Sequence, residues 1–190
     1  ACHADFDAKL TDYKRRGVIV PKHKLLKTPA QLEGIRKAGK LNTEILDMVG
    51  ENIRAGMSTE EINTLVHEYT VSHGGIPAPL NYNGFPKSVC TSVNDVICHG
   101  IPAADEVLKE GDIINVDVTT ILDGFYADAS RMFCIGEVSE EAKRLVEVTK
   151  ESVDLALKEV KPWGFLGDIG AVISEYIYAH GYTVLHDIGG

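Results

Sequence analysis

Two aspartates, Asp117 and Asp128, stand at a spacing that can bring their carboxylates together. Two runs rich in β-branched and aromatic residues flank Asp123-Gly124, a pair that tolerates the positive φ angles of a type I′ turn. This pattern predicts a β-hairpin over residues 113–133. Counting outward from a two-residue loop sets both aspartates on one face as diagonal neighbours, with Cβ atoms roughly 7 Å apart.

Carboxylates at that distance repel each other, and the pKa of one of them rises unless a cation lies between them. Hard divalent ions take such oxygens as ligands. Solvated hairpin faces also carry Asp, so the hairpin alone leaves a surface pair and a metal site both open. The neighbourhood favours the metal site. Asp117 interrupts an aliphatic stretch over 113–118 that otherwise indicates burial on both faces, and a buried carboxylate needs a compensating charge.

A histidine that could handle protons stands at His99, within the stretch Cys98-His99-Gly100-Ile101-Pro102. The glycine and the proline of this stretch fix a turn directly after the apolar pair 96–97. We therefore expect a histidine held rigidly at a strand end, which suits a proton-transfer or substrate-orienting role. The stretch alone is equally consistent with a surface histidine.

Helix signals precede the hairpin and must position it. Thr28 offers an N-cap hydroxyl, followed by Pro at the first helical position and Gln at the third. These signals predict a long amphipathic helix that ends near Gly56. Ser58 caps a second helix, which stops at Gly74-Gly75. A loop rich in turn-forming residues then leads to a strand over 88–93.

The order of a long helix, a short helix and a glycine returns after the hairpin. Ser139 opens the third helix, and the fourth ends before Gly181. A shift of 107 residues carries five residues of the second helix onto identical residues of the fourth: Ile62 onto Ile169, Glu68 onto Glu175, Tyr69 onto Tyr176, His73 onto His180 and Gly74 onto Gly181. The chain therefore predicts two similar halves, in which the second hairpin would begin beyond Gly190.

The composition is that of an ordinary globular protein: 44% of the 190 residues are hydrophobic and 25% are charged. The sequence has no signal-peptide pattern and no apolar run of the ~18 residues that a membrane helix needs. Its four cysteines include no C-x-x-C pair, which favours reduced thiols. We expect a cytoplasmic protein without a membrane span.

Charge divides the chain into two parts. Residues 1–28 carry seven Lys or Arg against three Asp, whereas the whole chain has a net charge of −9. A basic arm on an acidic body suits a tether to an anionic surface such as RNA, although such an arm is more often a solvated extension lying over the domain. We expect a basic N-terminal extension over 1–27 and a folded domain over 28–190.

Four motifs, taken in order, closely resemble those of type I methionine aminopeptidases, a group within peptidase family M24. They are NYNGFPKSVCTSVN at 81–94, CHGIP at 98–102, GDIINVDV at 111–118 and DGFYADAS at 123–130. The resemblance runs from about residue 28 to the end. It implies an α/β (α+β) pita-bread fold with two pseudo-symmetric halves, the second incomplete in this chain, in agreement with the repeat.

The resemblance also implies a dinuclear metal site of two Asp, one His and two Glu. Asp117 and Asp128 are the implied aspartate ligands, and His99 is the implied catalytic histidine, which contacts the substrate near the scissile bond. Thr119 would lie close to the metal-bound water. The implied pocket for the methionine side chain consists of Tyr82, Phe85 and Cys90, with Pro79 at its rim.

The implied activity is removal of the N-terminal methionine from nascent proteins, with two divalent ions (cobalt, manganese, iron or zinc) activating a water. The family's ligand histidine lies in a Gly-Gly-His-Gly motif, and this chain stops at Gly189-Gly190. We therefore expect this chain alone to be an inactive fragment of an enzyme that is monomeric at full length. The basic arm would hold that enzyme at the ribosome. Asn83 stands where many members carry His, which leaves a proton-transfer role there open.

Two alternatives stay open on the sequence. An aminopeptidase P or prolidase type enzyme would share the fold and the two metals but would need a pocket that accepts a following proline. A non-catalytic pita-bread module that binds a peptide or partner would have lost its metal. The presence of Asp117, Asp128 and His99 argues against that second alternative.

Overall fold

The computed structural model of the chain describes residues 2–20, 22 and 25–186, with side chains in the first helix from residue 5 onward. Gly189-Gly190, from which the expected position of the ligand histidine was inferred, lie outside the described residues. In chain order the elements are α1 (Cys2–Arg15), α2 (Pro29–Asn52), α3 (Thr59–Ser72), β1 (Ile76–Pro77), the 3-10 helix η2 (Tyr82–Gly84), β2 (Cys90–Val93), β3 (Ile113–Leu122), β4 (Phe125–Cys134), α4 (Glu140–Glu159) and α5 (Leu166–Ala179).

The predicted hairpin is the centre of an antiparallel sheet. β4 pairs with β3 along its whole length, while β1 and β2 both pair with β3 as well. Asp123 and Gly124 have φ angles of 52° and 81°, as a type I′ turn requires. The register places Thr119 opposite Asp128. Both the turn and the register predicted from the sequence are confirmed.

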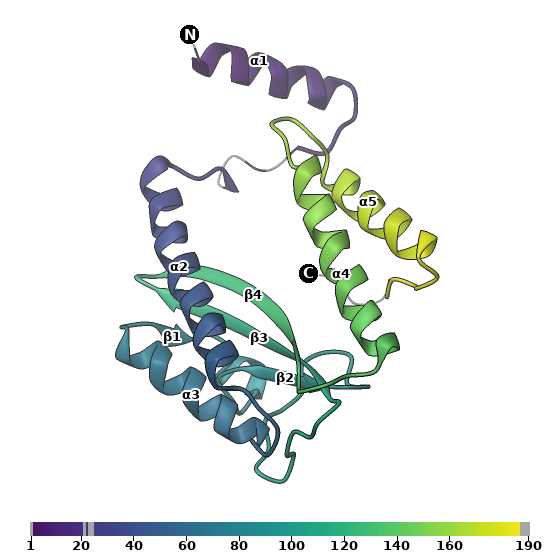
Figure 1. Ribbon diagram of the computed structural model, residues 1–190. Helices are drawn as coiled ribbons and strands as arrows, with labels where there is room; N and C mark the ends of the chain where they lie inside the picture. Colours follow the sequence, from purple (N-terminus) through teal and green to yellow (C-terminus); the bar gives the residue numbers. More distant parts are fainter. Residues whose placement is uncertain (1, 21, 23–24, 187–190) are drawn as a thin grey trace.

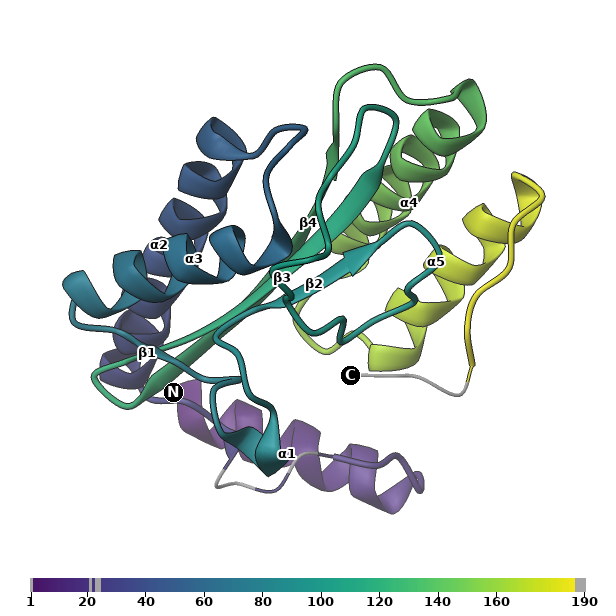
Figure 2. The same ribbon diagram turned by 90° about the horizontal axis from the view of Figure 1, so that it is seen from below.

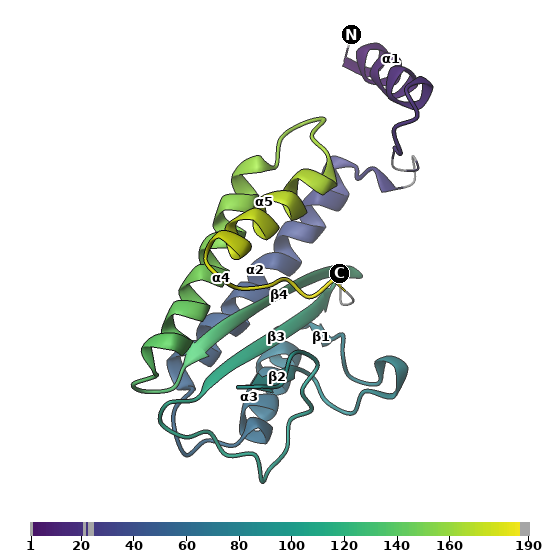
Figure 3. The same cartoon turned by 90° about the vertical axis from the view of Figure 1, so that its right-hand side faces the viewer.

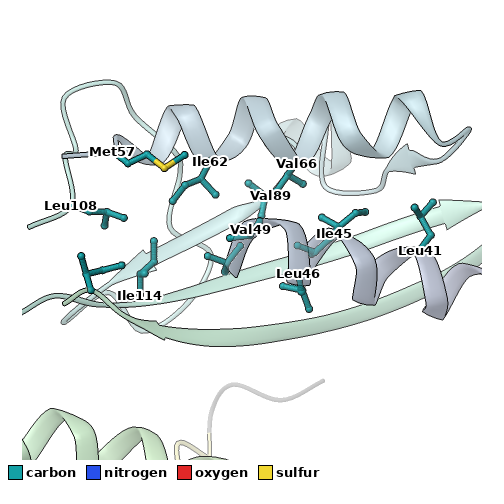
Figure 4. Close-up of a cluster of buried hydrophobic side chains, with 13 residues drawn as sticks. Leu41, Ile45, Leu46, Val49, Met57, Ile62, Val66, Val89, Leu108 and Ile114 are labelled. Atoms are coloured by element: carbon teal, nitrogen blue, oxygen red, sulfur yellow. The ribbon is translucent and has the colours of Figure 1, made fainter. Parts of the chain in front are cut away.

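Helices α2 and α3 cover one face of this sheet (Figures 1 and 2). Buried residues recur along α2 at helical spacing, at Leu41, Ile45 and Val49, so one stripe of the helix faces the strands. Figure 4 shows this layer, in which side chains from both helices and Ile114 of β3 belong to one buried cluster. Each large aliphatic side chain buried there contributes about 1.5–3 kcal/mol.

The opposite face of β3 is open, and this corrects one expectation. Burial alternates along the strand: Ile114, Val116 and Val118 are buried, whereas Asp117 and Thr119 are only partly buried. The aliphatic stretch does not lie between two covered faces. An antiparallel sheet can pack helices on one face and leave the other exposed, and here the aspartates occupy that exposed face.

The predicted helix caps are present. Thr28 forms a capping box with Gln31, and Ser58 forms one with Glu61. Helix α2 ends slightly earlier than expected, because Ile53 is extended, with φ −65° and ψ 131°. These local signals were sufficient to fix where the two helices under the hairpin begin.

The repeat is also present in the structure. The shift of 107 residues carries α3, Thr59–Ser72, onto α5, Leu166–Ala179. In both helices a tyrosine and a histidine pack with ring centroids 4.1 Å apart. In both, the histidine Nδ1 lies 2.8 Å from the tyrosine carbonyl oxygen one turn earlier. The two halves therefore share a helix end as well as an order of elements.

Helices α4 and α5 pack against each other as a second pair on the β4 side of the sheet (Figure 1). Helix α1 lies apart from the sheet, at the end of the molecule where α4 connects to α5 (Figure 3). This helix was not expected from the sequence, which predicted only a basic extension. Among the described residues, no helix combines the length and the hydropathy needed to cross a membrane.

Candidate active site

A cavity of about 780 Å³ opens on the face of the sheet that α2 and α3 leave free. Elements from three parts of the chain meet there: the loop after β1, the segment after β2, and the hairpin. All eight site residues expected from the sequence line it: Asp117, Asp128, His99, Thr119, Tyr82, Phe85, Cys90 and Pro79.

The two aspartates come from neighbouring strands, Asp117 from β3 and Asp128 from β4. The Thr119 hydroxyl donates a hydrogen bond to Asp128 Oδ1 over 3.1 Å, which orients that carboxylate. Partial burial, and after it the charge of Asp128, raises the pKa of Asp117, while the charge of His99 acts in the opposite direction. The two carboxylates therefore repel each other as close neighbours on one face of the hairpin, as their register requires.

A divalent cation fits this pair in part. Two carboxylates that destabilise each other would both be stabilised by a hard cation, and carboxylate oxygen is a ligand that such ions prefer. Within the described part of the chain, however, no group of three or more His, Cys, Asp or Glu side chains gathers as a metal site would require. The described residues thus supply two aspartates of the five implied ligands.

His99 reaches the cavity because its loop is fastened to β2. The Thr91 N–H donates to the Gly100 carbonyl over 2.9 Å, and the Gly100 N–H donates to Ser92 Oγ over 3.2 Å. A Cβ at Gly100 would collide with the Thr91 carbonyl oxygen, so only glycine allows this approach. His99 itself has a φ of 53°, a left-handed conformation.

The expectation that His99 ends a strand is wrong. Val96 and Ile97 are exposed residues of a turn and loop, and β2 ends at Val93. An apolar pair is too short to specify a strand without a partner to pair with. The loop is held by bonds to β2 instead.

Cys90 lies on β2 directly opposite Asp117. Burial of the thiol, with the nearby charge of Asp117 as the next cause, raises the pKa of Cys90 to about 11. The side chain therefore stays a neutral thiol at physiological pH, with little nucleophilic or metal-binding character. It suits the apolar wall of a pocket.

The loop after β1 carries the aromatic side of the cavity. The Tyr82 N–H donates to the Pro79 carbonyl, and the Phe85 N–H donates to the Tyr82 carbonyl, each over 2.9 Å. Asn81 and Asn83 have φ angles of 67° and 48°, which asparagine tolerates better than most residues. Asn83 thus has a backbone reason to be asparagine, whatever its chemistry.

Helix α3 anchors the far end of this loop. The Ser88 N–H donates to Asn63 Oδ1 over 2.8 Å, and the Ser88 hydroxyl lies 2.8 Å from His67 Nδ1. Lys87 forms an ion pair with Glu60. The pocket loop is therefore fixed by the same helix that packs under the sheet.

Two large side chains of the cavity wall were not anticipated, Ile101 and Tyr126. Tyr126 is an exposed aromatic residue on β4, two positions before Asp128 and so on the same strand face. The alternation that located Asp128 could have located Tyr126 as well. No local signal marks Ile101, because its place depends on how the loop from 98 to 102 folds over β2.

A family model described as metallopeptidase family M24 matches residues 33–189. The methionine aminopeptidase of Rickettsia prowazekii is 49% identical over 156 residues, which are 82% of this chain and 60% of that protein. Methionine aminopeptidase A of Synechocystis is 49% identical over 160 residues, which are 84% of this chain and 63% of that protein. The chain thus spans about 60% of the length of these relatives.

Solved structures give the same picture of the fold. The crystal structure of the Rickettsia prowazekii methionine aminopeptidase matches with a TM-score of 0.83 at 47% identity, covering 85% of this chain and 65% of that one. An X-Pro aminopeptidase from Thermotoga maritima matches with a TM-score of 0.70 at 26% identity, covering 83% of this chain and 43% of that one. The α/β pita-bread fold expected from the sequence is confirmed over the part of it that this chain spans.

Proposed function

The chain belongs to metallopeptidase family M24, and on this premise we propose that the intact protein removes the N-terminal methionine from nascent proteins by metal-dependent hydrolysis. One observation carries the proposal: both aspartates, His99 and the apolar pocket residues line a single cavity. The similarity to methionine aminopeptidases over most of the chain supports the choice of substrate. Since the chain spans about 60% of those relatives, the activity is proposed for the protein as a whole.

Asp117 and Asp128 would hold the metal ions, together with ligands from beyond the described residues. Divalent ions at such a site polarise a carbonyl and lower the pKa of water, which makes a strong nucleophile available at neutral pH. Cobalt, manganese, iron and zinc all accept carboxylate and imidazole ligands, so the aspartates do not select among them. Membership in a metallopeptidase family implies that a metal is bound, without giving its identity or number. That two ions bind is part of the proposal.

The other polar residues of the cavity would orient these groups and the substrate. The Thr119 hydroxyl donates to one oxygen of Asp128 and would leave the other oxygen available to a metal ion. His99, held on its loop by Gly100, would hydrogen-bond the substrate beside the scissile bond. A loop held in place by backbone hydrogen bonds loses little freedom on binding, which would favour orientation of the peptide.

The methionine side chain would lie against Tyr82, Phe85 and Cys90, with Pro79 at the rim. A neutral thiol and aromatic edges suit a thioether, because sulfur and aromatic rings make favourable soft contacts. Small pockets of this kind usually combine apolar walls with few polar groups. The raised pKa of Cys90 keeps a negative charge out of this pocket.

The experiment that tests the proposal compares two peptide classes in the intact protein with divalent metal. We expect methionine release from Met-Ala-type peptides and no comparable cleavage of Xaa-Pro peptides. His99→Ala should lower turnover on the order of a hundredfold with the metal content unchanged. Preferential cleavage before proline would support the aminopeptidase P or prolidase alternative. Binding of peptides without any cleavage would support the non-catalytic module.

We also propose that the enzyme works in the cytoplasm, close to ribosomes. The described cysteines, Cys90, Cys98 and Cys134, are all free thiols, as a reducing compartment favours. The excess of Lys and Arg in residues 1–28 would supply a salt-sensitive attraction to RNA. Deletion of residues 1–27 should therefore weaken co-sedimentation with ribosomes at low salt. Unchanged co-sedimentation would remove the ribosome from the proposal.

A further inference from the structure

Helix α1 presents one face to a tryptophan far away in the sequence. Phe6, Lys9, Leu10 and Tyr13 recur at the spacing that places side chains on one side of a helix. Trp163, in the connection between α4 and α5, contacts three of them. Its ring lies 5.3 Å from the Phe6 ring and 5.8 Å from the Tyr13 ring, centre to centre, and Lys9 Nζ lies 4.7 Å above it.

The Tyr13 contact is the most complete of the three. The Tyr13 and Trp163 rings are stacked, with an angle of 4° between their planes. The Tyr13 hydroxyl also lies 3.4 Å from the Trp163 carbonyl oxygen, to which it donates. Phe165 meets the Tyr13 ring edge-on at 6.1 Å, and the Arg16 guanidinium lies 5.5 Å from the Tyr13 ring centre. One tyrosine thus meets two aromatic rings and a cation.

The backbone conformation of Trp163 is an independent indication that the position of its ring matters. The Gly164 N–H donates to the Lys161 carbonyl over 3.0 Å, closing a turn with Pro162 at its second position. Trp163 occupies the third position with a φ of 68°, where such turns normally place glycine. A bulky residue keeps this conformation only when its surroundings hold it there.

Helix α1 also has a particular place in the molecule. Its C-terminal end leads through residues 16–28 into α2, which packs on the sheet of the first half. Its aromatic face, in contrast, contacts Trp163 in the connection of the second helix pair, and Figure 3 shows the helix at that end of the molecule. A helix of 14 residues is marginal in water without tertiary packing. The contacts at Trp163 are therefore what would keep it folded.

We propose that α1 docks on Trp163 and thereby fastens the N-terminal end of the first half to the α4–α5 connection of the second half. We call this docked helix the clasp. The clasp does not depend on the metal or on the peptidase activity. It uses the aromatic face of the extension and leaves Lys14 and Arg15, both exposed, on the remaining surface of the helix. The extension is therefore a docked helix rather than a solvated arm.

Hydrogen exchange of backbone amides in the intact protein tests the clasp. In the wild type, amides of residues 6–15 should exchange at least about tenfold more slowly than in the same helix as a free peptide, since an undocked helix this short is marginal. Tyr13→Ala should remove that protection and speed exchange at residues 161–166. Exchange in α3 should not change. Lys14→Ala, a matched change at a neighbouring exposed position, should behave as the wild type.

A second variant separates the clasp from a purely local turn. Trp163→Gly suits the positive φ of the turn, so it relieves the backbone while removing the ring. The clasp predicts that α1 nevertheless loses its protection in Trp163→Gly. If α1 stays protected in that variant, or if Tyr13→Ala leaves residues 161–166 unchanged, the clasp is contradicted.

Discussion

Asp117 is held in a position that costs the folded state energy, and this cost has a definite pH dependence. Its pKa is raised from the ordinary value of 3.8, mainly by burial and then by Asp128. Below that ordinary value the carboxyl is protonated in both the folded and the unfolded chain, so it costs nothing. The cost grows as the pH rises above 3.8, and it is complete once the pH exceeds the raised pKa of the folded state.

The pH dependence of this cost leads to the first prediction. In metal-free protein at neutral pH, Asp117→Asn should raise Tm, because the amide has no charge to bury and does not repel Asp128. The gain should shrink as the pH falls toward 3.8. Asp123→Asn is the matched control: it lies in the same hairpin but outside the cavity, and asparagine tolerates its positive φ. Equal shifts in Tm for the two variants would argue against a destabilising pair.

Cys90 gives a second prediction at this scale. Because burial raises its pKa to about 11, the thiol should resist alkylation at neutral pH. Cys98 and Cys134 are exposed and should be modified first. Mass spectrometry of the alkylated peptides would measure this order. Early modification of Cys90 in the folded protein would mean that the pocket wall is more open or more polar than described.

The sequence could place a site residue only where interactions between residues close together in the chain determine its position. The aspartates could be placed because Asp123-Gly124 sets the loop length, and the loop length sets the register. His99 could not be placed in detail, because its loop is held by Gly100 packing on the carbonyl oxygen of Thr91. That contact joins segments that do not interact through any local pattern.

Among the helices and strands, helix α2 packs against the hairpin at Gly34, where the Phe125 ring lies. A Cβ at Gly34 would collide with the Phe125 ring, whereas a Cβ at Gly39 meets nothing within 4 Å. Alanine stabilises a helix interior relative to glycine by roughly 0.5–1 kcal/mol. The two glycines of one helix therefore have opposite expected responses to the same substitution.

The third prediction is that Gly39→Ala raises the free energy of unfolding by about 0.5–1 kcal/mol, while Gly34→Ala lowers it by roughly 1–3 kcal/mol through overpacking. Denaturant titration of the two variants would measure both. Stabilisation by Gly34→Ala would show that Phe125 can move aside at little cost, and that the contact does not fix how α2 lies on the hairpin.

The sequence predicted α2, α3 and α4 because their caps and apolar spacing are local signals, and it predicted α5 from apolar spacing alone. It did not predict α1 as a docked helix. The residues that hold α1 lie 150 positions away from Tyr13, and a stripe of two aromatic residues on a charged segment does not by itself indicate a partner. Its helical spacing was nevertheless visible in the sequence.

At the scale of the whole molecule, the repeat relates two helix pairs but only one described hairpin. The first pair covers its sheet, whereas the second pair exposes large apolar side chains, among them Leu157, Val160 and Leu166. Exposed apolar patches on this scale usually mark a surface that another element covers. The aspartates line a cavity together with residues of the loop after β1 and of the segment after β2.

The fourth prediction follows from this. A polypeptide of these 190 residues, prepared alone, should bind divalent ions weakly and release no methionine, because two carboxylates make a weak site. It should also associate through the exposed face of the second helix pair. Light scattering, metal analysis and a peptide assay would measure these properties. A monodisperse, metal-loaded and active preparation would contradict both the repeat and the assignment of the site.

If Asp117 and Asp128 hold the metal that drives methionine release, loss of either carboxylate should remove both bound metal and activity. In the intact protein at limiting metal, methionine release from a Met-Ala-type peptide is compared among Asp117→Asn, Asp128→Asn and the control Asp123→Asn. We predict that each of the first two lowers the rate by at least about a hundredfold and reduces bound metal, while the control retains both. Full activity in either cavity variant would show that these carboxylates do not hold the catalytic metal.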